Sequence, residues 1–244
     1  MANKLLAIFG DVHSNLDALN AVLDDCRSQG VTDFLCTGDV VGYNACPREC
    51  LKIVRELGCP VVMGNHDHYV SSRQNLEDFN PAAAEVIEWT RSQLGEDEIA
   101  WLKSLPFLKT VTGISLVHAT LDHPDGFGYV FDHLQAESHC IHQVVPLCFH
   151  GHSHCPVIYE KQSSAVYRID AQDFTMPTGR KYFINVGSVG QPRDGDPRAA
   201  YVIYDPKSRM VRFRRLEYDI EAAQGRIRKA GLPMRLADRL ATGQ

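Results

Sequence analysis

Short apolar runs in the first half of the chain each end at a turn that carries polar residues. These runs are Leu5–Phe9, Phe34–Thr37, Val61–Met63 and Ile114–Val117. The residues that follow them are Gly10-Asp11, Gly38-Asp39, Gly64-Asn65 and His118. Apolar runs of this length, bounded by turn signals, are typical of buried strands. We therefore expect four strands with polar side chains at their carboxyl ends.

Helical periodicity fills the segments between these runs. Apolar residues recur at helical spacing over Leu16–Cys26, and Gly30 stands just past the pattern as a stop. The next crossover opens at Pro47, a residue preferred at the first helical position, and ends at Gly58. Residues 80–105 also follow a helical pattern and form an insertion between strands. The alternation of strand and helix predicts β-α-β units.

The second half of the chain changes to a β pattern. A polar, histidine-rich stretch over 119–145 contains a predicted helix at 132–143, and the short strand Leu147–His150 follows it. After the turn Gly151-His152-Ser153-His154, short strands alternate with turn-rich segments at 157–160, 166–169, 182–186, 200–204 and 211–216. We expect these strands to form a second, largely antiparallel sheet. Two helices are predicted over 219–229 and 234–240.

Length and hydrophobic content bound the domain organisation. A chain of 244 residues with 44% hydrophobic residues is compatible with one large α/β domain. We predict a main catalytic domain over residues 1–218 and a C-terminal helical appendage over 219–244. The apolar part of residues 1–9 is too short for a signal-peptide core, and no apolar stretch reaches the roughly 20 residues that span a bilayer. We therefore predict a cytoplasmic protein without a membrane partner.

The net charge and the positions of the cysteines argue against several other classes of protein. The formal net charge of −5 gives no global attraction for nucleic acid. A cluster of arginines over 209–215 leaves a local basic patch open, although its alternation fits a half-exposed strand equally well. The eight cysteines are spread along the chain without a Cys-x-x-Cys pair, which favours reduced, buried thiols over a disulfide framework or a zinc finger.

The polar residues at the strand ends form one joint pattern. Ligands of open α/β sheets gather at the carboxyl ends of strands, so Asp11, His13, Asp39, Asn65 and His118 should converge. Taken singly, such an aspartate is usually a turn or cap residue, and a lone histidine is more often structural. The joint pattern is more informative because five motifs follow one another in a fixed order along the chain. They are Gly-Asp-Val-His, Gly-Asp, Gly-Asn-His-Asp, a later histidine and Gly-His-Ser-His.

These motifs resemble those of the calcineurin-like metallophosphoesterase superfamily. The resemblance covers roughly residues 4–190 and is closest to the small prokaryotic phosphodiesterase/phosphatase subgroup. It implies a four-layer α/β/β/α sandwich of two mixed sheets flanked by helices. It also implies a dinuclear metal centre, with Asp11, His13, Asp39 and His154 holding one ion and Asp39, Asn65, His118 and His152 holding the other. Asp39 would bridge the two ions.

The chemistry implied by the resemblance is hydrolysis of a phosphate ester. Two cations roughly 3.5–4 Å apart would share a carboxylate and a bridging hydroxide, which is the expected nucleophile. Nitrogen and oxygen ligands suit Mn²⁺, Fe, Co²⁺, Ni²⁺ or Zn²⁺, and the family favours manganese or a mixed iron-containing centre. His66 resembles the catalytic histidine of the family and would act as general acid or phosphate stabiliser. Asp67 is expected to orient its ring and favour the imidazolium.

Three further positions have competing interpretations. Asn15 is a candidate contact for the substrate phosphate or, equally, the N-cap of the helix that begins near Leu16. Arg193 is a candidate phosphate clamp, against a structural salt bridge with Asp194 or Asp196. Tyr43 is a candidate pocket residue, with a packing role as the alternative.

The motif after the second strand narrows the range of substrates that the chain could hydrolyse. Gly38-Asp39-Val40-Val41-Gly42-Tyr43-Asn44 lacks the arginine of the Gly-Asp-x-x-Asp-Arg-Gly motif that is typical of protein phosphatases and related symmetrical dinucleotide hydrolases. We therefore predict hydrolysis of a small-molecule phosphoester, diester or monoester, with a nucleotide as the favoured type. A nuclease acting on nucleic-acid ends would require a basic track, which the acidic balance disfavours, and a non-catalytic scaffold would lack ligands that are present here. Residues 80–105 and 119–145 should shape the entrance and selectivity of the site.

Overall fold

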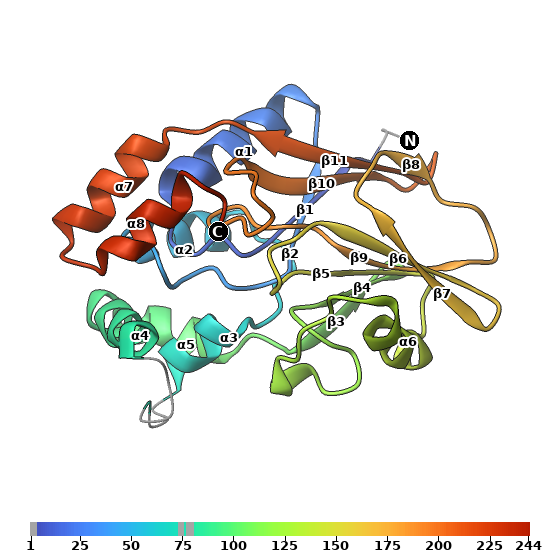
Figure 1. The fold of residues 1–244 in the computed structure, drawn as a ribbon, viewed down its shortest axis with the longest axis horizontal. Coiled ribbons are helices and arrows are strands. Elements are labelled where there is room, and N and C mark those ends of the chain that lie inside the picture. Colours follow the sequence, from blue (N-terminus) through green and yellow to red (C-terminus); the bar gives the residue numbers. More distant parts are fainter. Residues whose placement is uncertain (1–3, 73–75, 77–80) are drawn as a thin grey trace.

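Two β-sheets stack face to face, and helices cover both outer faces (Figure 1). The computed structural model describes residues 4–72, 76 and 81–244, with the side chains of 81 and 82 also outside the description. Residues 1–3 of the predicted catalytic domain and residue 80 of the predicted helical insertion therefore lie outside the described residues. The order of layers is helix, sheet, sheet, helix, which confirms the predicted four-layer sandwich of two mixed sheets.

The first sheet holds the strands that open and close the main fold. Its order is β2 (Asp33–Cys36), β1 (Leu6–Phe9), β10 (Ala199–Asp205), β11 (Met210–Leu216) and β8 (Phe174–Thr175). Strands β1 and β2 are parallel, as a β-α-β unit requires, and the other neighbours are antiparallel. The carboxyl ends of β1 and β2 therefore meet at one edge of this sheet.

The second sheet has six strands and contributes a second pair of parallel strand ends. Its order is β3 (Leu108–Val111), β4 (Ile114–Val117), β5 (Leu147–His150), β9 (Lys181–Asn185), β6 (Val157–Gln162) and β7 (Ala165–Asp170). Strands β4, β5 and β9 are parallel to one another, and the remaining pairs are antiparallel. The carboxyl ends of β4 and β5 lie side by side for this reason.

Two sequence predictions about the strands were wrong. The segments 200–204 and 211–216 belong to the first sheet rather than the second, because β10 pairs antiparallel with β1. Successive residues of β10, such as Val202 and Ile203, pack on opposite faces of this sheet, as expected for a central strand. The run Val61–Met63 forms only one parallel bridge, between Val61 and Cys36, since the chain turns into helix α3 (Asn65–Ser71) directly afterwards.

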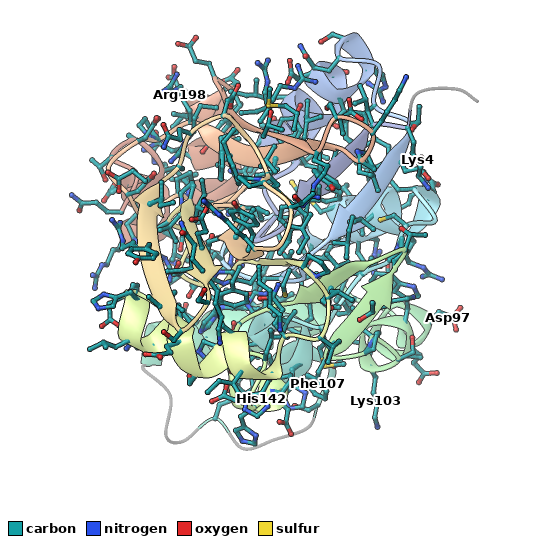
Figure 2. All side chains as sticks on the ribbon, turned by 90° about the vertical axis from the view of Figure 1, so that its right-hand side faces the viewer. Lys4, Asp97, Lys103, Phe107, His142 and Arg198 are labelled. Atoms are coloured by element: carbon teal, nitrogen blue, oxygen red, sulfur yellow. The ribbon has the colours of Figure 1, made fainter. Side chains whose placement is uncertain are left out.

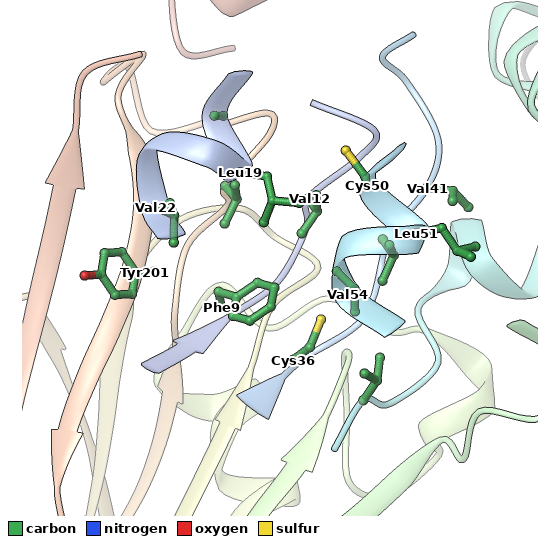
Figure 3. Packing of buried hydrophobic residues seen from close by; sticks show 14 of the residues in the cluster. Phe9, Val12, Leu19, Val22, Cys36, Val41, Cys50, Leu51, Val54 and Tyr201 are labelled. Atoms are coloured by element: carbon green, nitrogen blue, oxygen red, sulfur yellow. The ribbon is translucent and has the colours of Figure 1, made fainter. Parts of the chain in front are cut away.

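Helices α1 (Leu16–Ser28) and α2 (Pro47–Glu56) cover the outer face of the first sheet. Figure 3 shows the core beneath them, where Leu19 and Val22 from α1 and Val54 from α2 surround Phe9 and Tyr201 of the sheet. These side chains are almost completely buried, and each fully buried large apolar residue stabilises the fold by about 1.5–3 kcal/mol. This packing fixes the loops that follow β1 and β2.

The other helices cover the second sheet and one side of the sandwich. Helix α6 (His133–His142) packs Ala136 and Cys140 onto the outer face of the second sheet. In Figure 2 this helix crosses the lower face of the molecule, with His142 labelled near its end, while the exposed Lys4, Lys103 and Arg198 project at the periphery. The insertion over 80–105 forms α4 (Pro81–Gln93) and α5 (Glu96–Lys103), and both pack against α3.

The C-terminal helices pack against the same chain. Helix α7 (Ile220–Lys229) lies against α1, and α8 (Met234–Leu240) packs on α7 (Figure 1). Their apolar cluster includes Ile227 and Leu240 and extends to Val86 of α4 and to Tyr43. The domain boundary at residue 218 stays a prediction. No helix in the described part of the chain has the length and apolar character that crossing a membrane requires.

Candidate metal centre

The candidate ligands lie at the carboxyl ends of strands from both sheets. Asp11 follows β1 and Asp39 follows β2 in the first sheet, while His118 follows β4 and His152 follows β5 in the second. Asn65 is the first residue of α3. The predicted convergence is present, but it occurs where the two sheets meet rather than along one sheet.

One group of four side chains forms a first cluster. Its members are Asp11, His13, Asp39 and His154, and one ligand atom from each lies within 4.8 Å of the others. The Nε2 atom of His13 is 3.1 Å from His154 Nε2 and 3.4 Å from Asp39 Oδ2. The Nε2 atom of His154 is also 3.2 Å from Asp11 Oδ1. All four residues are at most 1% exposed.

A second cluster shares Asp39 with the first. It joins Asp39, His118 and His152. The Nε2 atom of His118 is 3.4 Å from Asp39 Oδ2 and 3.2 Å from His152 Nδ1. Asn65 Oδ1 lies 3.1 Å from the same nitrogen. The structure thus brings all seven predicted ligands together, with Asp39 between the two groups.

The histidine tautomers show that the centre suits cations. The Nδ1 atoms of His13 and His118 lie 3.2 Å and 2.8 Å from the carbonyl oxygens of Val41 and Thr37, and His154 Nδ1 lies against the carbonyl of Gln191. A carbonyl only accepts, so each Nδ1 carries a proton, and each Nε2 presents a lone pair to the centre whenever its ring is neutral. Each of these histidine rings is held by a backbone carbonyl, and its Nε2 atom lies beside the carboxylates. Such a set of nitrogen and oxygen donors fits divalent metal ions.

The charges in the centre are strongly coupled. Burial opposes protonation of His118, but the Asp39 carboxylate outweighs it and raises the pKa of His118 to about 9. Burial also opposes ionisation of Asp39, yet the neighbouring His118 and His13 hold its pKa well below the ordinary value. At His13, burial dominates and lowers the pKa well below its ordinary value. The site therefore favours an ionised Asp39 with positive charge next to it.

Five of the candidate ligands adopt a strained backbone conformation. Their φ angles are 48° at Asp11, 46° at His13, 52° at Asp39, 66° at His152 and 60° at His154. Positive φ is uncommon for residues with a side chain, costs of order 1–3 kcal/mol each, and clusters at functional sites. The surrounding sheets hold these five residues in place, since the conformation does not stabilise itself.

Two glycines leave room for carboxylates of the centre. A Cβ atom on Gly64 would collide with the Asp39 carboxylate, and one on Gly151 would collide with Asp11 Oδ2. Each glycine directly precedes a candidate ligand, Asn65 or His152. The Gly-Asn and Gly-His pairs of the sequence thus have a steric cause, because the backbone of one ligand loop must approach the carboxylate of another.

His66 and Asp67 have different surroundings from those predicted. The His66 ring packs 4.9 Å from the His13 ring and 4.2 Å from the Tyr43 ring, measured between centroids. Burial lowers the pKa of His66 to about 4. The Asp67 carboxylate accepts from the backbone N–H groups of Val40, Val41 and Gly64, at 2.9–3.2 Å. The predicted orientation of the His66 ring by Asp67 is therefore replaced by a role in fixing the ligand loops.

Arg193 faces the centre without a carboxylate partner among the described residues. Its Nη2 atom donates to Tyr43 Oη and to Gln191 Oε1, both at 3.2 Å, and its Nε is buried without a hydrogen-bond partner in the described part of the chain. The competing salt bridges are made by other arginines, because Asp194 pairs with Arg215 and Asp196 with Arg198. Tyr43 accordingly contacts both Arg193 and the histidine rings, so it lines the site as well as packing.

Asn15 is the N-cap of α1. Its Oδ1 accepts from the backbone N–H of Ala18 at 3.1 Å, and its Nδ2 donates to the carbonyl of Gly190 at 3.0 Å. The side chain is 1% exposed. These contacts match the capping interpretation, and its predicted phosphate contact stays a prediction.

Two aromatic residues beside the centre, Tyr129 and Phe131, were not predicted from the sequence. The ring of Tyr129 stacks on the ring of His152, with 4.1 Å between centroids, and Phe131 stacks on Tyr129 at 5.2 Å. They lie in the 119–145 segment that was predicted to shape the entrance. The available signal was the alternation of large apolar residues and glycine or valine in Phe127-Gly128-Tyr129-Val130-Phe131, within an otherwise polar stretch.

Comparisons with known proteins agree with the geometry of the centre. Residues 5–209 match the family model for the calcineurin-like phosphoesterase superfamily domain. An uncharacterized protein of Methanocaldococcus jannaschii is 37% identical over the full length of both chains. The crystal structure of a metallophosphoesterase from Sphaerobacter thermophilus is 39% identical, with a TM-score of 0.88, and the match covers 99% of this chain and 100% of that one.

A third relative matches over a shorter region. The symmetrical bis(5′-nucleosyl)-tetraphosphatase of Aromatoleum aromaticum is 29% identical over 116 residues, which cover 46% of this chain and 42% of that enzyme. The similarity to this relative is therefore limited to less than half of either protein.

Proposed function

The chain belongs to the calcineurin-like phosphoesterase superfamily, and from this premise we propose that it hydrolyses phosphoester bonds at a centre of two divalent cations. The proposed substrate is a small molecule with a phosphodiester or phosphomonoester group, and a nucleotide is the favoured type. The observation that carries the proposal is the position of Asp39 between two clusters of buried donor atoms.

Seven side chains would hold the cations in this proposal. Asp11, His13 and His154 would bind one ion, Asn65, His118 and His152 the other, and Asp39 would bind both. When bound, the cations would lower the pKa of water toward neutrality and withdraw charge from the phosphate oxygens. The nitrogen and oxygen donor set and the family resemblance support Mn²⁺, with Fe, Co²⁺, Ni²⁺ and Zn²⁺ as alternatives.

Two residues outside the ligand set would act on the substrate. Arg193 would bind phosphate oxygens, since its guanidinium has an unsatisfied Nε and no carboxylate partner among the described residues. His66 would donate a hydrogen bond to the phosphate, whose negative charge would offset the effect of burial on the pKa of His66 and let the ring carry a proton for the leaving oxygen. Asp67 would act as a positioning residue, because its carboxylate ties the loop after β2 to the start of α3.

The partial similarity to a tetraphosphatase supports a nucleotide-like substrate. The enzyme of Aromatoleum aromaticum is named for a dinucleoside substrate. The present chain has Gly42-Tyr43-Asn44 where the related motif carries Asp-Arg-Gly, so a different phosphoester is proposed here. A cytoplasmic location stays a prediction.

The structure weakens the nuclease alternative. The predicted basic patch over 209–215 lies mainly on β11, where Arg214 pairs with Asp25 and Arg215 pairs with Asp194. Charges neutralised in this way contribute little to binding a phosphate backbone. The scaffold alternative is disfavoured by the complete ligand set.

Substitution of the shared carboxylate tests the proposed function. Asp39→Ala should lose bound metal and turnover together, by about 10³-fold or more, because one side chain serves both ions. We would reconstitute the protein with Mn²⁺, determine metal content by mass spectrometry, and measure rates on matched aryl phosphomonoester and phosphodiester substrates. Asp170→Ala, which removes an exposed carboxylate on β7, is the control. A folded Asp39→Ala protein with full activity would refute the bridging assignment.

A further inference from the structure

A short column of aromatic rings leads from the centre to the surface. Tyr129 stacks on the candidate ligand His152 with an angle of 24° between the ring planes, and Phe131 stacks on Tyr129 with an angle of 8°. The two outer residues are strongly exposed, Tyr129 by 46% and Phe131 by 57%. The column therefore joins a metal-binding position to a flat apolar surface that is open to solvent.

The segment that carries these rings is anchored between them. Val130 is buried, and its carbonyl oxygen accepts from the hydroxyl of Tyr159 at 3.3 Å. The backbone N–H of Phe131 donates to Gln135 Oε1 at 2.7 Å, at the start of α6. Exposed aromatic rings on an anchored backbone lose little conformational freedom when a ligand stacks on them, which favours binding.

A positively charged side chain lies beside the centre. Arg193 Nη2 donates to Tyr43 Oη at 3.2 Å, and its guanidinium carbon lies 5.6 Å from the centroid of the Tyr43 ring. Burial lowers the pKa of Arg193, but Tyr43, Tyr129 and Asp11 outweigh it and raise that pKa above its ordinary value. The buried Nε of Arg193 has no hydrogen-bond partner in the described part of the chain, so it can bind an anionic group.

The combination of flat rings and the Arg193 guanidinium points to a specific kind of ligand. A simple sugar phosphate would engage Arg193 but would leave the rings exposed. An aromatic base can stack on a flat ring, whatever its hydrogen-bonding pattern, while its phosphate reaches the charged side. A nucleoside phosphate has both parts.

We propose that Phe131, supported by Tyr129, is a stacking platform for the base of a nucleoside phosphate substrate. The proposal rests on the proposed function, since the phosphate of this substrate would lie at the same metal centre. Phe131 then determines specificity without taking part in the hydrolysis itself.

Binding of a matched ligand pair tests the platform. AMP and ribose 5-phosphate carry the same sugar phosphate and differ in the base. We would measure their affinities for the Mn²⁺-loaded protein by calorimetry and, in parallel, its hydrolysis of an aryl phosphoester. AMP should bind about tenfold or more tightly than ribose 5-phosphate, which corresponds to about 1.4 kcal/mol for one stacked base.

Two variants separate the platform from general effects. Phe131→Ala should reduce the ratio of the two affinities to within about twofold and leave the affinity for ribose 5-phosphate unchanged. Tyr167→Ala removes a comparably exposed aromatic ring, on the edge strand β7, and should keep the native ratio. Phe131→Ala is the cleaner choice because Tyr129 also contacts His152.

The outcomes distinguish the two proposals. A native ratio near one, or a ratio that Phe131→Ala leaves unchanged, would overturn the platform while the proposed function stands if the aryl phosphoester is hydrolysed. Absence of hydrolysis of the aryl monoester and diester would instead count against the proposed function, whatever the ratio of affinities.

Discussion

The metal centre and its entrance are built in opposite ways. In the centre, Asp11, His13, Asp39 and His154 are at most 1% exposed and have positive φ angles. At the entrance, Tyr129 and Phe131 are about half exposed, and their neighbours anchor the segment. Atoms that must lie at fixed positions are thus held by sheets and backbone hydrogen bonds, whereas atoms that recognise a ligand are carried by surface side chains. We expect substitutions in the centre to abolish chemistry and substitutions at the entrance to alter selectivity.

The largest effect outside the ligand set is expected for His66. His66→Gln should lower kcat by about 10²–10⁴-fold on substrates with poor leaving groups, because general acid catalysis contributes a factor of that size. Metal content should stay at the native level, since no metal-ligand atom is removed. Rates on a series of aryl esters with increasing leaving-group pKa, together with metal analysis, would check both parts. Parallel loss of metal would show that His66 belongs to the structure of the centre instead.

A smaller effect is expected for Arg193, which lies between the two regions. Arg193→Gln should raise KM by about 10- to 100-fold, the equivalent of a charge-assisted hydrogen bond of about 1.5–3 kcal/mol. Arg198→Gln is the matched control, because Arg198 pairs with Asp196 at the surface. Steady-state kinetics on the same aryl phosphoester would measure the difference. Equal KM values in the two variants would remove Arg193 from the phosphate site.

The smallest effect on activity is expected for Asn15, although it is buried close to the ligand loops. Asn15→Ala should lower the free energy of unfolding by about 1 kcal/mol, because the cap of α1 is lost. KM should change by less than twofold. Urea denaturation and kinetics on the same preparation would compare the two quantities. A large rise in KM with unchanged stability would contradict the capping role and support the predicted phosphate contact.

Local sequence patterns predicted most elements and the convergence of the ligands. Strands such as β1 and β4 follow from apolar runs, and helices such as α1 follow from periodicity and a capping residue. Sheet membership was harder, because the pairing of β10 with β1 joins residues almost 200 positions apart, which no local pattern records. The predicted strand at Val61–Met63 shows the same limit, since it forms one parallel bridge to Cys36 before the chain turns into helix α3.

Some features of the candidate site could likewise be predicted from the sequence, and others could not. Six of its seven candidate ligands could be predicted because each is part of a short motif that begins with glycine, and His118 because it follows an apolar strand. The contacts of Asp67 could not, since its partners are backbone N–H groups of Val40 and Val41, which every sequence has. The stack of Tyr129 and Phe131 on His152 depends on how a long loop returns to the centre, and single aromatic residues in a polar stretch do not reveal that path.

The distribution of ligands along the chain has a consequence for biosynthesis. Asp11 and Asp39 leave the ribosome early, but His152 and His154 are added only after more than a hundred further residues. An N-terminal segment on its own offers carboxylates, His13 and Asn65, which lack the histidines of the second sheet. Because chains are made at about 5–20 residues per second, this incomplete set persists for several seconds at least. We therefore expect selective metal loading to be a late event in maturation, after the second sheet has docked on the first.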